Sequence, residues 1–168
     1  LKPFAEVSKD YTEINSSSQD GNPLFKLWKR DKDQQLIAEL PRGWERQKHY
    51  IAMTVSGGDL WAGLQGNARY VYWKRYGDRI ALIAPNTDTR STGDQESKAS
   101  VNNIFTDRVI VDVPILAMGP TGQPVIDLDN LLVGEGSKFF GGSMAGANNR
   151  LATIRSAKTF PENMEIEI

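Results

Sequence analysis

Short apolar runs of strand length recur along this sequence, separated by polar or glycine-rich turns. Residues 24–30 and 35–40 are two such runs around a short polar turn, a pattern that predicts a β-hairpin. Residues 69–75 and 79–84 form a second pair around a Gly-Asp turn. Their aromatic and β-branched side chains favour strands. The pattern therefore predicts two antiparallel hairpins.

Other stretches also have the length and composition of strands. We expect residues 49–56, which end at a Gly-Gly pair, to form a central strand, and residues 57–67 to form a loop. The apolar run 109–118 is expected to bend at Pro114, because proline cannot donate a ladder hydrogen bond. Further strands are predicted at 124–128, 151–159 and 164–168.

Helical signals are few. Asp94 is a candidate N-cap for a helix that runs to about Phe105, and residues 129–132 are expected to make one helical turn. Long amphipathic helices between strands are absent, which disfavours an α/β fold. We therefore predict a mainly β domain, an antiparallel sandwich or strongly curved sheet with one or two short helices. Residues 1–168 are expected to be one domain, cut from a longer protein because no Met precedes Leu1.

Composition narrows the classes of partner. The chain has 20 basic and 21 acidic residues, so it lacks the basic excess that nucleic-acid binding requires. No apolar run approaches the ~20 residues of a membrane-spanning helix. We expect no nucleic-acid partner and no membrane-spanning segment.

One histidine, His49, and no cysteine leave little catalytic chemistry. A catalytic zinc requires about three protein ligands, usually drawn from His, Cys and carboxylates. A general base at His49 would need an orienting carboxylate and a nucleophile, and neither is close in sequence. We therefore predict no catalytic residue, no metal ligand and no cofactor in this chain.

Two weaker patterns have simple structural interpretations. Asp127 and Asp129 alternate like the first ligands of a calcium loop, but the later glycine and glutamate of that loop are missing, so a turn or helix cap is the preferred interpretation. The glycine-rich stretches 57–63 and 134–148 lack the Gly-Lys-Ser/Thr ending of a phosphate loop and are predicted to be mobile. Phe139 and Phe140 in the second stretch are candidates for contact with a neighbouring domain.

The four tryptophans divide into two groups. Trp28 and Trp73 lie in predicted strands and are expected in the core. Trp44 and Trp61 lie in polar or glycine-rich stretches, so they are candidates for contact with a ligand or another domain.

Several stretches, taken in order, resemble a known family. They are Lys-Pro-Phe-Ala-Glu-Val at 2–7, the hairpin 73–87 and Phe-Pro-Glu-Asn-Met-Glu-Ile at 160–166, with 25–28 and 125–128 between them. Together they resemble the N-terminal domain of unknown function of large, exported bacterial zinc-dependent metallopeptidases. The catalytic part of those proteins is metzincin-like and carries its His-Glu-x-x-His motif far downstream. No residue here matches that motif, so no catalytic residue carries over.

The resemblance implies a non-catalytic accessory domain that packs on the catalytic domain of the same polypeptide and helps to shape it. It also implies a periplasmic or extracellular location, with zinc only in the downstream domain. A glycan- or peptide-binding β module that uses Trp61 and the 134–148 loop is the alternative hypothesis. A hydrolase with His49 as base is a third.

Overall fold

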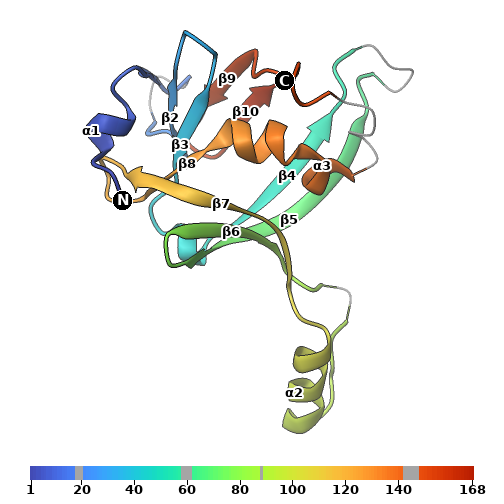
Figure 1. The fold of residues 1–168 in the computed structure, drawn as a ribbon. Helices are drawn as coiled ribbons and strands as arrows, with labels where there is room; N and C mark the ends of the chain where they lie inside the picture. Colours follow the sequence, from blue (N-terminus) through green and yellow to red (C-terminus); the bar gives the residue numbers. More distant parts are fainter. Residues whose placement is uncertain (18–20, 58–61, 88, 142–147) are drawn as a thin grey trace.

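The computed structural model describes residues 1–17, 21–57, 62–87, 89–141 and 148–168. In this part of the chain, eight antiparallel strands form one sheet in the order β1-β2-β3-β8-β7-β6-β5-β4, and β9 and β10 form a second, two-stranded sheet (Figure 1). The strands are β1 Thr12–Ile14, β2 Lys26–Lys29, β3 Leu36–Glu39, β4 Lys48–Thr54, β5 Gln65–Tyr76, β6 Arg79–Ala84, β7 Arg108–Met118, β8 Pro124–Asp127, β9 Ser156–Thr159 and β10 Met164–Glu167. The helical elements are α1 Phe4–Val7, η1 Trp44–Arg46, α2 Gln95–Ile104, η2 Asn130–Gly134 and α3 Gly136–Phe140.

Both predicted hairpins are confirmed. Strands β2 and β3 pair with Trp28 opposite Ile37, and β5 and β6 pair with Trp73 opposite Leu82. Gly77 begins the two-residue turn of the second hairpin with φ +61°, a conformation that favours glycine.

Strand β7 joins the two halves of the large sheet. Its residues up to Pro114 pair with β6, and its residues from Ile115 onwards pair with β8. The register shifts between Ile115 and Ala117, so a bulge follows the proline. The strand therefore changes its partner at Pro114, where the sequence predicts a bend. The fold is mainly β, and the sheet is strongly curved rather than closed into a barrel (Figure 1).

The core lies between the two halves of the curved sheet. Leu27 and Leu36 from one half belong to the same buried cluster as Trp73 and Leu82 from the other. A second, smaller cluster lies around Trp28, where the ring of Phe4 in α1 packs edge-on at 4.9 Å. The predicted core positions of Trp28 and Trp73 are both confirmed.

The prediction of a mobile loop at 134–148 is wrong for its first part. Residues 136–140 form α3, and Phe140 joins Leu131 and Val133 of η2 in the main core. Burial of these apolar side chains offsets the ordering cost that the glycines impose. Residues 142–147, which include Met144, lie outside the described residues.

Strand β4 is an edge strand, which corrects the prediction of a central one. It pairs with β5 only, within the described sheet, and its residues alternate between exposed and half-buried. A central strand would be covered on both edges, but a run of apolar residues does not specify how many neighbours pair with it.

The helix predicted after Asp94 is confirmed as α2. The carboxylate of Asp94 accepts a hydrogen bond from the Ser97 backbone N–H at 2.8 Å, so Asp94 is the N-cap. None of the residues in α2 is buried, and the helix projects away from the sheet (Figure 1). It lies in the long connection between β6 and β7.

Candidate functional site

The structure places two of the four predicted contact residues in the core. Trp44 is 4% exposed and Phe140 is 8% exposed, and both belong to the main buried cluster. Each ring is therefore occupied in packing this domain. Trp61 and the side chain of Phe139 lie outside the described residues.

His49 is half-buried near the start of β4, and its ring lies 5.7 Å from that of Phe25. Burial lowers the pKa of His49. Its Nε2 is buried and has no hydrogen-bond partner among the described residues. The packing against Phe25 gives the imidazole a role in the fold, and no described carboxylate orients it as a general base.

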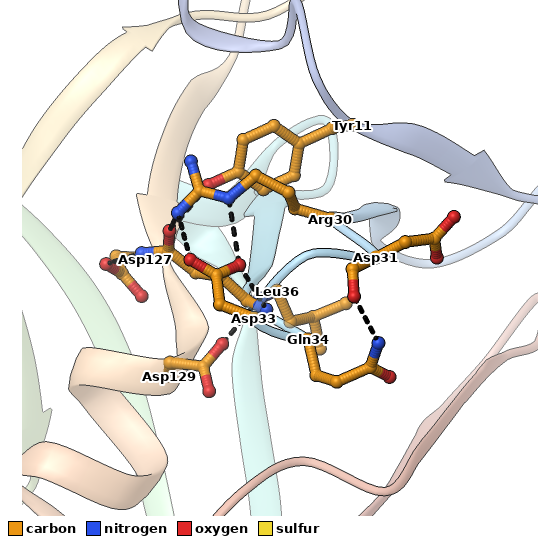
Figure 2. A network of polar contacts seen from close by, with 9 residues as sticks. Tyr11, Arg30, Asp31, Asp33, Gln34, Leu36, Asp127 and Asp129 are labelled. Carbon is orange, nitrogen blue, oxygen red and sulfur yellow. Dashed lines mark hydrogen bonds and ion pairs between the residues drawn. The ribbon is translucent and has the colours of Figure 1, made fainter.

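A polar network connects the β2–β3 turn to the end of β8 (Figure 2). Arg30 donates two hydrogen bonds to the carboxylate of Asp33, at 2.9 and 2.7 Å, and its guanidinium lies 4.9 Å from the centre of the Tyr11 ring. The side chain of Gln35 accepts from the Tyr11 hydroxyl at 2.8 Å and donates to Asp127 at 2.7 Å. Bidentate and charge-assisted bonds of this kind fix the geometry of the turn.

Asp127 performs the capping role that the sequence favours, whereas Asp129, at the N-cap position of η2, makes no side-chain cap bond and instead contacts β3. The carboxylate of Asp127 accepts from the Asn130 backbone N–H at 3.0 Å, and that of Asp129 accepts from the Leu36 backbone N–H. Among the described residues, no group of three or more His, Cys, Asp or Glu side chains has the arrangement of a metal site. The two carboxylates therefore join β8 to β3 and to the first turn of η2.

Partial burial raises the pKa of Asp129 to about 6, and the charges of Asp127 and Asp33 act in the same direction. A folded-state pKa above the unfolded value means that the folded protein binds more protons between about pH 4 and 6. Stability from this group therefore falls as the pH rises through that window. Asp129→Asn keeps a side-chain oxygen for the Leu36 N–H but does not titrate.

We expect the difference in unfolding free energy between Asp129→Asn and the wild type to shift in favour of the variant from pH 4 to pH 7. Urea denaturation at several pH values measures it. The pKa values of Asp33, Asp94 and Asp107 are lowered, so stability from these three groups rises with pH. Both proteins share this contribution, and taking the difference between them removes it. A difference that stays constant with pH would contradict the assignment.

A buried carboxylate holds the turn between β7 and β8. Glu39 is fully buried, and its Oε1 accepts from the backbone N–H and hydroxyl of Thr121, at 2.9 and 2.8 Å, and from the Gln123 N–H at 3.2 Å. Gly119 lies against this carboxylate, and a Cβ there would overlap it. In the sequence, the sign of this role is that Glu39 is the one acidic residue within the otherwise apolar run 36–40.

Asp107 connects the segment that follows β6 to strand β5, a role that nothing in the sequence indicated. It accepts hydrogen bonds from the Asn86 backbone N–H at 2.9 Å and from the Tyr72 hydroxyl at 2.7 Å, and these bonds lower its pKa. Burial and the same carboxylate raise the pKa of Tyr72 to about 12. Two shallow hollows share Asp107 in their walls, one beside α2 and one beside η1.

The hollow beside α2 has a volume of about 330 Å³. Its wall combines two cationic side chains, Arg90 and Lys98, with the side chains of Asn102 and Phe105. Neither cation makes an ion pair with another described residue. The two cations give this hollow chemistry suited to an external anionic group.

Comparison with known proteins identifies the chain at the level of a domain family. A family model described as "Domain of unknown function (DUF5117)" matches residues 63–168, the stretch from just before β5 to the end of β10. No curated protein and no solved structure matches this chain. Within the described residues, no helix has both the length and the apolar character needed to cross a bilayer.

Proposed function

The chain belongs to the DUF5117 family, and from that premise we propose that it is a non-catalytic N-terminal accessory domain of an exported zinc metallopeptidase-like protein. In this proposal the domain packs on the catalytic domain of the same polypeptide and helps to shape it. Zinc and the catalytic residues lie in that second domain, and the whole protein is periplasmic or extracellular.

The observation that carries this proposal is an apolar surface at the end of α2. Ile104 is 69% exposed, Phe105 47% and Val109 51%, and the three lie close together in sequence where α2 leads into β7. Exposed large apolar residues gathered in one short segment favour a surface that another protein covers. A domain that serves to pack on its neighbour requires such a surface.

The experiment begins with the complete reading frame that encodes this chain. We expect it to continue into a segment with the His-Glu-x-x-His motif. The chain and that segment are then produced separately, and their association is measured by isothermal titration calorimetry. Peptidase activity of the segment is measured with and without the chain. A frame without the motif, or two pieces that neither associate nor affect activity, would refute the proposal.

A second candidate, a glycan- or peptide-binding module, is favoured by aromatic residues on the outer face of β4 and β5. Tyr50 and Tyr70 occupy paired positions, Tyr76 lies further along the same face, and all three are exposed. Lys48 and Lys74 lie over the rings of Tyr70 and Tyr76, at 5.5 and 5.3 Å. Exposed aromatic faces are suited to stacking on sugars or side chains. Binding of a soluble oligosaccharide that Tyr50→Ser abolishes, without association with a catalytic domain, would favour this candidate.

A further inference from the structure

The connection that contains α2 is larger than the sheet requires. Strands β6 and β7 are antiparallel neighbours, and a tight turn would suffice to join them. Instead the chain leaves the sheet after Ala84 and returns at Arg108. The base of this excursion is held by the Asn86 side chain, which donates to the Phe105 carbonyl at 2.9 Å, and by the Asn86 N–H bond to Asp107.

Helix α2 does not obtain its stability from packing within this domain. It has ten residues, none of them buried, and it projects from the sheet (Figure 1). Isolated helices shorter than about 12–15 residues are marginal in water even for favourable sequences. The Asp94 cap contributes only about 1 kcal/mol. A stable α2 therefore requires a surface outside this domain.

The hollow at the base of α2 defines the chemistry of that surface. Arg90 and Lys98 are two cations without an ion pair among the described residues, whereas Asp107, the carboxylate in the same wall, already accepts two hydrogen bonds. Two cations against one carboxylate leave the described lining of the hollow with a net positive charge, which an incoming carboxylate would meet. Phe105 lies in the wall of the hollow and belongs to the exposed apolar group, so one partner could contact both features.

We propose that α2 and the adjoining hollow form a docking surface for a protein segment in which a carboxylate is flanked by apolar side chains. The carboxylate binds between Arg90 and Lys98, and the apolar side chains cover Ile104, Phe105 and Val109. The contact also orders α2. The identity of the partner, the catalytic domain of the same polypeptide, rests on the proposed function; the chemistry of the surface does not.

The first arm of the test uses the chain and the separately produced remainder of its polypeptide. The double variants Arg90→Glu/Lys98→Glu and Ile104→Ser/Phe105→Ser are each expected to raise the dissociation constant by about tenfold or more. Lys32→Glu and Leu151→Ser are the matched controls, because both residues are exposed and neither belongs to the docking surface. Circular dichroism and urea denaturation establish that each variant is folded.

The second arm is independent of the partner's identity. Amide hydrogen exchange of residues 95–105 is followed while the chain is titrated with the peptide acetyl-(Glu-Leu)₄-amide. We expect exchange in α2 to slow with added peptide in the wild type and in both controls, but not in Arg90→Glu/Lys98→Glu. The slowing should weaken at high salt, because screening reduces the attraction between exposed charges.

The outcomes separate the two proposals. If the chain binds the remainder and the α2 variants bind as tightly as the wild type, the docking surface is refuted while the proposed function stands. If the remainder does not bind but the peptide slows exchange in α2, the docking surface stands and the proposed function fails. Unchanged exchange with the peptide, together with no effect of the variants, overturns the docking surface.

Discussion

Trp73→Ala is expected to lower the free energy of unfolding by about 3–5 kcal/mol, the range observed when a large buried aromatic side chain is removed. The indole of Trp73 is 4% exposed and belongs to the cluster that joins the two halves of the sheet. Its removal leaves a cavity where β5 faces the opposite half, and the strands cannot collapse fully to fill it. Urea denaturation measures the change.

Tyr70→Ala is the matched control for this prediction. Tyr70 is also an aromatic residue of β5, but its side chain points to the outer face and is exposed. We expect its loss to cost less than about 1 kcal/mol, since surface substitutions of this kind usually have small effects. Equal losses of stability for the two variants would contradict the position of Trp73 between the halves of the sheet.

Glu39→Ala is expected to lower the free energy of unfolding by about 2–4 kcal/mol. Loss of a buried acceptor typically costs about 1–3 kcal/mol, and the truncated side chain adds a cavity. In this protein the N–H and hydroxyl of Thr121 and the N–H of Gln123 would lose their acceptor together. Calorimetric or urea unfolding measures the loss.

The conservative variant Glu39→Gln separates the hydrogen bonds from the charge. Its amide oxygen can occupy the position of Oε1 and accept from the same three donors, so we expect less than half the loss of Glu39→Ala. Glu39 Oε2 has no hydrogen-bond partner among the described residues, so the amide NH2 of Gln would lie there without an acceptor, and this accounts for the part of the loss that remains. If Gln is as destabilising as Ala, the hydrogen bonds to the turn are not what Glu39 contributes.

The sequence by itself determined the local elements of this protein. Two hairpins, the Asp94 cap of α2 and the capping role of Asp127 all follow from patterns within a few residues of one another. Backbone preferences and short-range hydrogen bonds set these features, so a short window of sequence contains the necessary information. The mainly β fold class follows from the same patterns.

The tertiary structure decided which elements are neighbours and which side chains they cover. The edge position of β4 depends on where the sheet ends, which no strand encodes alone. Phe140 and Trp44 lie in polar or glycine-rich stretches yet are buried, because elements distant in sequence supply their contacts. A composition rule assigns such residues to the surface, since it does not include those contacts.

The candidate docking surface also depends on the tertiary structure. Arg90, Lys98, Phe105 and Asp107 have no distinctive spacing in the sequence, and they line one hollow only because the connection between β6 and β7 folds back on itself. The sequence specified where α2 begins, through the Asp94 cap. Whether α2 packs on this domain depended on the geometry of the sheet, which directs the helix away from the core. Local sequence therefore determined the elements, whereas long-range packing determined the exposed surface, because exposure depends on contacts between residues far apart in the chain.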